Sequence, residues 1–168
     1  TKIIKSIRNH GLVDRNEVKQ FGYVSRMDTL QAAILDYRLK NLPTVIKKRR
    51  KNAKQYFNLI DNKNCLLPFE KNDEFNTYHT FVIQTEKRDA LKKYLYSKGI
   101  ETSIHYPIPI HMQPASKKLN YKRGDFPITE KQSETILTLP IHQYLEDHEI
   151  QYISKNLNEF YKSNAHWN

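Results

Sequence analysis

The chain has 168 residues, a net charge of +10 at pH 7 and a hydrophobic content of 38%. That is enough apolar chain to build a folded domain, which excludes intrinsic disorder. No apolar run is long enough to span a bilayer and no signal-peptide pattern is visible, so we expect no membrane partner. A single cysteine, Cys65, excludes an internal disulfide and a multi-cysteine zinc site, and it favours a reducing, cytoplasmic compartment.

The positive charge leaves two kinds of partner open. It is typical of nucleic-acid-binding modules, and it equally suits an enzyme whose substrate carries phosphate. The chain opens at Thr1 in what reads as the middle of a helix, so we expect a piece of a longer protein. We interpret Cys65 as a partly buried loop residue, because no helix start or basic side chain stands beside it to activate a thiol.

The first 60 residues are predicted to be mainly helical. Residues 1–10 are typical of a helix that His10 and Gly11 close. A polar loop follows, in which Gly22 can adopt backbone angles that other residues resist. The apolar spacing from Met27 predicts a helix with a broad buried face as far as about Leu42. A second helix is predicted from Pro43 to about residue 60, because proline suits a first helical turn.

A run of five basic residues lies inside this second helix, at positions 47–51. Such a run can indicate a nucleic-acid or localisation patch. Five consecutive helical residues, however, sweep about 500° around the axis and form no single face. We therefore interpret the run as a solvated helix turn.

The remainder reads as a small α/β unit. Residues 61–76 are loop-like, and Gly99 and a capping box at Thr129–Gln132 mark the end and the start of helices. The pattern predicts strands at 78–83, 100–106 and 139–142, and helices at 89–98 (burying Ala90, Leu91, Tyr94 and Leu95), 129–137 and 146–161. Residues 115–128 read as a basic loop, and 164–168 as a frayed tail.

Three prolines stiffen the segment 102–114, which carries His105, Tyr106 and His111. Side chains on such a segment lose little conformational entropy when they bind a ligand. Metal binding is disfavoured, because two histidines fall short of the three or four ligands of a zinc site. A packed proline-rich loop and a substrate-binding segment both remain open.

Three blocks resemble one known family. Residues 22–35 are similar to the Gly-x-Asn-Ser-Arg-Met-Asp-x-Leu-Gln-Ala-Ala-Ile-Leu signature of the DegT/DnrJ/StrS sugar aminotransferases, except that Val24 stands in place of the asparagine. The segment 105–111 resembles the family's Thr-x-x-His-Tyr-x-x-Pro-x-His run. Residues 129–142 resemble the block that ends in Leu-Pro-Ile-His.

The resemblance implies the C-terminal part of an α/β, fold-type I aminotransferase. It implies the end of a large domain and connecting helices at 1–60, and a small α+β domain with a mainly antiparallel sheet flanked by helices at 61–168. The implied cofactor is pyridoxal 5′-phosphate, with Tyr23, Ser25 and Arg26 as cofactor-binding candidates. The family asparagine reaches the cofactor phosphate, a contact that Val24 cannot make. The resemblance makes His105, Tyr106 and His111 the substrate-binding candidates.

The implied reaction transfers an amino group from glutamate to a keto sugar on a nucleotide, within a homodimer. The Schiff-base lysine and the acid that faces the cofactor ring lie upstream of Thr1 in this family, so we expect no catalytic residue here and no activity from this chain alone. A sugar dehydratase of the same family, a basic nucleic-acid-binding module and a non-catalytic scaffold domain are the alternatives.

Overall fold

The structure is a computed structural model that describes residues 1–61, 63 and 65–163; the predicted tail at 164–168 lies outside this part. The chain forms two compact units, one from Thr1 to Pro43 and one that begins at Thr44. The predicted division at residue 60, between a large domain's end and a small domain, stays a prediction.

Helix α1 (Lys2–Ile7) ends earlier than predicted. The N–H groups of Asn9 and Gly11 both donate to the carbonyl of Ser6, at 2.9 and 2.8 Å, so Gly11 itself satisfies a carbonyl of the last turn. His10 and Gly11 have φ of 61° and 81°, and His10 is the first residue after the helix in the left-handed region. His10 and Gly11 therefore do close the helix, but the glycine takes the position after the one predicted for it.

Helix α2 (Thr29–Leu59) is one helix with Pro43 inside it, so the predicted break at Pro43 was wrong. The proline removes one helical hydrogen bond, but its flanks are rich in leucine, lysine and arginine, which favour helix. The predicted broad buried face is not buried by the described residues. The apolar side chains of residues 27–42 are exposed, among them Met27, which precedes α2, and Leu30, Ile34, Leu35, Leu39 and Leu42 on its first part.

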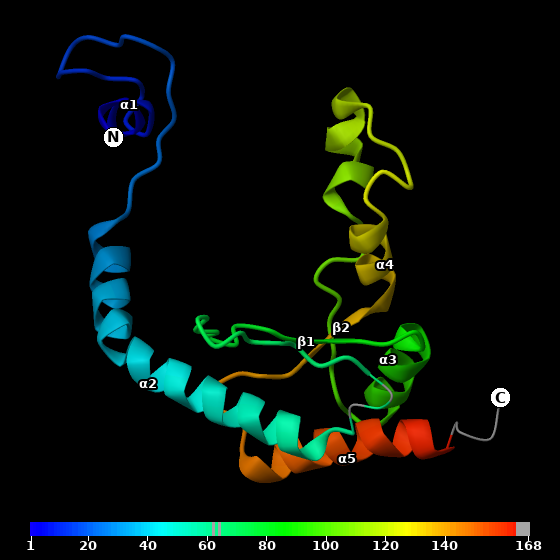
Figure 1. Ribbon diagram of the computed structural model, residues 1–168. Helices are drawn as coiled ribbons and strands as arrows, with labels where there is room; N and C mark the ends of the chain where they lie inside the picture. Colours follow the sequence, from blue (N-terminus) through cyan, green and yellow to red (C-terminus); the bar gives the residue numbers. More distant parts are fainter. Residues whose placement is uncertain (62, 64, 164–168) are drawn as a thin grey trace. The chain divides into compact units, whose positions relative to one another are not determined.

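The second unit is built on a two-stranded antiparallel sheet (Figure 1). In it β1 (Phe81–Gln84) pairs with β2 (Ile136–Leu139), Phe81 lying opposite Leu139. Single bridges add Leu66 beside Gln84 and Ser103 beside Thr138, on the two outer edges. The predicted mainly antiparallel sheet is thus confirmed.

The strand positions were predicted less well. Tyr78 has φ of 48°, which ends any extended run, so β1 starts only at Phe81. The segment 100–106 contributes one bridge rather than a strand. Pro140 has no N–H for a ladder and follows directly after β2, so the predicted strand at 139–142 lies three residues too late.

Helices α3 (Arg88–Ser97) and α5 (Asp147–Ser163) lie within two residues of their predicted bounds. Gly99 follows α3 with φ of 73°, as predicted. Helix α4 (Pro127–Thr135) begins at Pro127, so Thr129 lies inside it and the predicted capping box was wrong. The predicted basic loop contains the 3₁₀ helix η2 (Pro114–Leu119), which follows η1 (Ile110–Met112).

The core lies between the sheet and helices α2, α3 and α5. Its fully buried side chains include Tyr56, Phe81, Ile83, Leu91, Leu95, Leu137, Leu139, Ile150 and Leu157. Ala90, predicted to be buried, is exposed, and Tyr94 is half-buried. Helix α5 runs beside the C-terminal part of α2 in the same direction (Figure 1): Lys51 Nζ lies 2.8 Å from Asp147, and Asn158 Nδ2 donates to the Leu59 carbonyl at 2.8 Å.

The basic run at 47–51 is largely committed to contacts within this unit. Arg49 donates to the carbonyls of Tyr78 and His79, at 3.2 and 2.9 Å. Arg50 binds both carboxylate oxygens of Glu70, at 2.7 and 3.2 Å. The interpretation as a solvated turn suits Lys47 and Lys48, which are exposed, but not the two arginines.

Glu70 holds the loop 70–78 against α2. The guanidinium of Arg50, followed by the N–H of Asn76 and the hydroxyl of Tyr78, lowers the pKa of Glu70 from its ordinary 4.5 to about 2. The same guanidinium stacks on the ring of Phe75, 4.5 Å from its centroid. One carboxylate thus connects α2 to the segment that precedes β1.

The Glu70→Gln variant tests this connection through its pH dependence. A carboxyl whose pKa falls on folding contributes stability above its unfolded pKa, and the contribution is lost as pH falls toward the folded pKa. Above pH 5 we expect Glu70→Gln to be less stable than the wild type in urea unfolding. The difference should shrink between pH 5 and about pH 2. Glu74→Gln, an exposed carboxyl in the same loop that pairs with Lys71 at 3.6 Å, is the matched control. Equal pH slopes for Glu70→Gln and the wild type would contradict the assignment.

Candidate functional site

The candidate cofactor loop, residues 20–26, is attached to residues 7–11 by backbone hydrogen bonds. The N–H of Tyr23 donates to the Ile7 carbonyl at 2.7 Å, and the N–H of His10 donates to the Tyr23 carbonyl at 3.1 Å. Ser25 exchanges two further bonds with Arg8: its N–H donates to the Arg8 carbonyl at 2.9 Å, and its own carbonyl accepts from Arg8 Nε at 2.7 Å. The loop is therefore held at Tyr23 and Ser25, mainly by main-chain contacts.

Two glycines make this close approach possible. A Cβ on Gly22 would lie 2.4 Å from both the Gly11 nitrogen and the Ile7 carbonyl oxygen. A Cβ on Gly11 would lie 1.6 Å from the Gln20 carbonyl oxygen. Gly22 has no positive φ, so it is needed for space rather than for the unusual backbone angles predicted from the sequence.

The loop presents three side chains that can donate hydrogen bonds: the Tyr23 phenol, the Ser25 hydroxyl and the Arg26 guanidinium. All three residues are exposed, and Arg26 also donates to the side-chain oxygen of Asn9. This donor set fits a phosphate group. Val24, also exposed, has no polar side-chain atom to add.

Pyridoxal phosphate also has an aldehyde end, opposite its phosphate, which requires an amine held in a binding site. The chain offers little for this end. Every lysine of the chain is within the described part, and all are exposed except the half-buried Lys92 of α3. The residues present thus fit the phosphate of pyridoxal phosphate and supply no buried amine.

His105 and Tyr106 lie next to a cavity of about 670 Å³ in the second unit. The cavity is lined by His105, Thr138, His142, Glu149 and Tyr152, together with apolar residues such as Leu139. The Nδ1 of His105 lies 3.0 Å from the Thr138 hydroxyl, an arrangement that orients the ring. Tyr106 is not part of the lining; it is 73% exposed, with its ring centroid 5.5 Å from that of His105.

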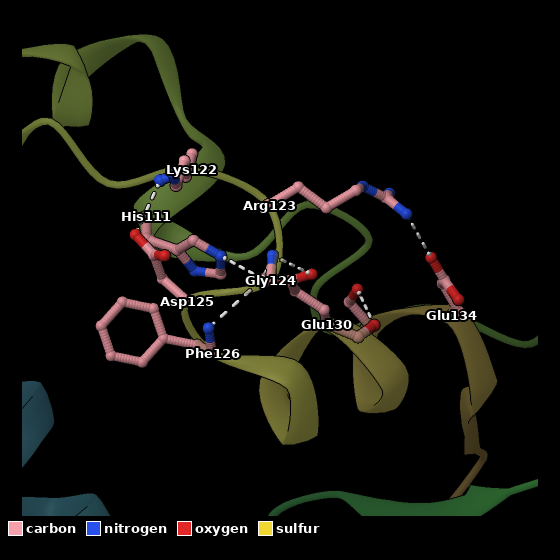
Figure 2. A network of polar contacts seen from close by, with 9 residues as sticks. His111, Lys122, Arg123, Gly124, Asp125, Phe126, Glu130 and Glu134 are labelled. Atoms are coloured by element: carbon pink, nitrogen blue, oxygen red, sulfur yellow. Dashed lines mark hydrogen bonds and ion pairs between the residues drawn. The ribbon is translucent and has the colours of Figure 1, made fainter.

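His111, the third substrate-binding candidate, is placed differently. Its side chain is only 7% exposed, and its Nε2 lies 2.9 Å from Glu130 Oε1 (Figure 2). The ring also packs on Phe126, with centroids 4.8 Å apart. His111 therefore does not join His105 at the cavity, and its role as a substrate contact stays a prediction.

Glu130 is the residue of this region that the sequence did not reveal. Besides facing His111, its two oxygens accept the N–H of Gly124 at 2.8 and 3.0 Å, and one accepts the N–H of Phe126 at 3.4 Å (Figure 2). Burial acts to raise the pKa of Glu130, but these hydrogen bonds outweigh it and the pKa lies below its ordinary value. An acidic residue in the first turn of α4 was the only available signal.

No group of three or more His, Cys, Asp or Glu residues within the described residues could hold a metal ion. Over the same part of the chain, no helix is both long and apolar enough to cross a membrane. Cys65 is buried more completely than the sequence suggested, and burial raises the pKa of its thiol to about 11.

Replacing Gly22 by alanine tests the packing of the candidate cofactor loop. The added methyl group meets main-chain atoms that no rotamer change can move away, so we expect the loop to detach from residues 7–11. Amide hydrogen exchange at Tyr23 and Ser25 should then accelerate by about tenfold or more. Gly99→Ala is the control, because it meets no atom within 4 Å and its strain is confined to the end of α3. Unchanged exchange in Gly22→Ala would show that the close approach is not required.

Known proteins are similar to this chain over most of its length. The profile of the DegT/DnrJ/EryC1/StrS aminotransferase family matches residues 1–158. The chain is 35% identical, over 93% of its length, to a protein named pleiotropic regulatory protein from Geobacillus stearothermophilus, of which it covers 43%. It is 34% identical, over 92% of its length, to the dTDP-3-amino-3,6-dideoxy-alpha-D-galactopyranose transaminase of Aneurinibacillus thermoaerophilus, of which it covers 42%.

The fold is shared with solved structures as well. The crystal structure of DesV from S. venezuelae superposes with a TM-score of 0.87 at 31% identity, over 94% of this chain and 43% of that one. The chain thus spans less than half the length of the relatives it matches. The family match over nearly the whole chain, with the same fold at 31% identity, is sufficient: the chain belongs to the DegT/DnrJ/EryC1/StrS aminotransferase family.

Proposed function

We propose that this chain is the C-terminal part of an aminotransferase that moves an amino group from glutamate to a keto sugar carried on a nucleotide. The observation that carries the proposal is the family match over residues 1–158, together with a close relative named as a transaminase of a dTDP-linked amino sugar. The cofactor of this family is pyridoxal 5′-phosphate. When bound, it serves as the electron sink for amine transfer.

In this proposal the candidate cofactor loop holds the cofactor phosphate. The Ser25 hydroxyl, the Arg26 guanidinium and the Tyr23 phenol are the donors, and the main-chain contacts with residues 7–11 keep them in place. Donors that are fixed before binding lose little entropy when the phosphate arrives. Val24 contributes at most its backbone N–H, so this loop binds the phosphate more weakly than one with the family asparagine.

On the substrate side, His105 is the residue best placed to contact a sugar. Its Nδ1 is engaged by Thr138, which leaves Nε2 to donate to or accept from a hydroxyl in the cavity. Tyr106 offers an exposed ring beside it, a suitable surface for the apolar face of a sugar. His111 contributes through its contact with Glu130 instead.

The lysine that binds the cofactor is proposed to lie in a preceding part of the protein, so the 168-residue chain alone is inactive. The full-length protein is proposed to be a cytoplasmic homodimer in which residues 22–26 serve the neighbouring subunit's cofactor site. The nucleic-acid alternative, which rests on the net charge of +10, is not favoured by the family match, and two of the basic residues, Arg49 and Arg50, bind within their own unit. Nothing observed favours the dehydratase or the scaffold alternative.

The test compares the full-length protein with this chain. Incubated with pyridoxal phosphate, glutamate and a dTDP- or UDP-linked keto sugar, the full-length protein should release 2-oxoglutarate and form the amino sugar, whereas the 168-residue chain should not. Arg26→Gln should weaken cofactor binding by about tenfold, as loss of a charged hydrogen bond does. Val24→Asn should strengthen it severalfold, since it adds a donor. Arg15→Gln, an exposed residue outside the 20–26 loop, is the control. Turnover by the isolated chain, or unchanged binding in both variants, would contradict the proposal.

A further inference from the structure

The lining of the cavity in the second unit differs in charge from the rest of the chain. The chain carries a net charge of +10, yet no lysine or arginine is among the described residues that line the cavity. Two glutamates are among them, Glu101 and Glu149. Carboxylates repel anions, so this lining disfavours a phosphate group inside the cavity. The volume of about 670 Å³ is typical of a site for a small molecule.

Three histidines also line the cavity: His105, His142 and His148. A neighbour engages the Nδ1 atom of each ring, and within the described part of the chain Nε2 is the ring nitrogen left for a ligand. A neutral imidazole has one nitrogen that donates a hydrogen bond and one that accepts. The partner of Nδ1 therefore determines whether Nε2 carries the proton.

His142 and His148 have opposite polarities. The Nδ1 of His142 accepts the main-chain N–H of Tyr144 at 3.3 Å, so the neutral ring carries its proton on Nε2. The Nδ1 of His148 lies 3.2 Å from a carboxylate oxygen of Glu146, which accepts when it is ionised, so this neutral ring carries its proton on Nδ1. His142 thus offers a ligand a donor, and His148 offers an acceptor.

The polarity of His105 depends on Thr138. The Thr138 hydroxyl lies 3.0 Å from the Nδ1 of His105, and Thr138 is only 8% exposed. The main-chain N–H and carbonyl of Thr138 are both bonded to Ser103, at 2.7 and 3.2 Å, which fixes its place in the sheet. Nδ1 is the one acceptor that the described residues offer to the hydroxyl proton. Because a buried donor without an acceptor is costly, the hydroxyl donates to Nδ1 and the ring carries its proton on Nε2.

Two side chains of α5 in the lining are held in place as well. Glu149 Oε2 accepts the N–H of Glu146 at 2.8 Å, and the Tyr152 hydroxyl donates to the Lys98 carbonyl at 3.1 Å. The cavity therefore presents donors and acceptors whose positions are set by contacts within the protein. A hydroxyl group both donates and accepts, so it is the uncharged ligand group that satisfies both kinds of partner.

We propose that Thr138 is a positioning residue that fixes His105 as an Nε2–H donor, and that the cavity, with His142 as a second donor, binds an uncharged, hydroxyl-rich ring and excludes phosphate. Donors that are fixed before binding lose little entropy, and they reject a ligand that leaves them unpaired. The identification of the ring as the sugar of a nucleotide sugar rests on the proposed function, and the diphosphate then lies outside the cavity. The tautomers and the exclusion of phosphate do not depend on that function.

Nitrogen NMR of the 168-residue chain, isotopically labelled at histidine, tests the tautomers, because protonated and unprotonated ring nitrogens have well-separated signals. At about pH 8, where imidazoles are ordinarily neutral, His105 and His142 should carry the proton on Nε2 and His148 on Nδ1. Replacing each histidine by glutamine assigns its signals. A proton on the Nδ1 of His105 in the wild type overturns the role of Thr138.

Variants of Thr138 test the same role. Thr138→Val keeps the shape of the side chain but removes the hydroxyl, so an Nδ1–H form of His105 should appear, whereas Thr138→Ser should keep the proton on Nε2. Thr135→Val is the matched control, because Thr135 is also buried and its hydroxyl donates to the Lys131 carbonyl at 3.0 Å, outside the cavity. Circular dichroism confirms that each variant is folded. Identical His105 signals in Thr138→Val and the wild type contradict the proposal.

Methyl glucoside and inorganic pyrophosphate test the ligand. The uncharged glucoside, in excess, should shift the Nε2 signals of His105 and His142, and pyrophosphate should leave them in place. In the full-length protein, Thr138→Val should raise KM for the nucleotide sugar about fivefold, a larger change than in kcat, because Thr138 acts on ligand binding through His105. Thr138→Ser should restore KM, and Thr135→Val should leave it within about twofold of the wild type.

Each outcome decides one part. No shift with the glucoside, or an equal shift with pyrophosphate, overturns the assignment of the ligand. An unchanged KM in Thr138→Val overturns the positioning of the substrate. If the full-length protein aminates no sugar while the glucoside still shifts both signals, the proposed function fails and the cavity remains a site for a hydroxyl-rich ring.

Discussion

The packing of the second unit depends on the buried side chain of Tyr56, which lies on α2. Its ring is fully enclosed, 4.9 Å from the ring of Phe81, and its hydroxyl donates to the Pro140 carbonyl at 2.8 Å. One side chain thus connects α2 to the start of β1 and to the residue that follows β2. One turn earlier on α2, Asn52 donates to the His142 carbonyl at 3.0 Å and fixes the same segment a second time. Burial raises the pKa of the Tyr56 hydroxyl, so it stays a neutral donor at any physiological pH.

The contacts of Tyr56 fix the sheet, and the sheet in turn positions both candidate functional features of the second unit. Because β2 is held at Pro140, its Thr138 is presented to Ser103 in a bridge and to His105 in a side-chain contact, which brings the segment 100–105 to the cavity. On its other side β2 follows directly from α4, the helix that carries Glu130. The cavity, through Thr138, and the contact of His111 with Glu130, through α4, are therefore both connected to the same four-residue strand.

The sequence predicted best what local periodicity determines. Apolar residues at helical spacing located α3 and α5, because Leu91, Leu95, Ile150 and Leu157 are buried for the same reason that they recur. The strands are only four residues long, too short for alternation to locate them, and the φ of Tyr78 leaves no mark in its residue type. At α4, Pro127 begins the helix two residues before the capping box that the pattern suggested.

The sequence could not predict the long-range contacts of the candidate site. Arg50 and Glu70 are 20 positions apart, and His111 and Glu130 are 19 apart. Nothing in either segment alone shows that a cation is neutralised within the unit or that a histidine is withdrawn from solvent. The resemblance to a known family named the loops that we propose carry the chemistry. It did not predict that His105 would line a cavity while His111 contacts Glu130.

The two units differ in what keeps their candidate functional loops rigid. This difference determines how each unit responds to an amino-acid substitution. The cavity of the second unit borders a core of side chains, which can repack around a substitution at some cost in stability. Among residues 1–43 Gly11 alone is buried, and the candidate cofactor loop is held by main-chain hydrogen bonds and two close backbone approaches. The three atoms nearest to a Cβ at position 22 are main-chain atoms of residues 7, 10 and 11, so making a neighbouring side chain smaller would not accommodate it. The shape of this loop is thus set by the backbone, and Tyr23, Ser25 and Arg26 can vary the donors it presents without altering the frame that presents them.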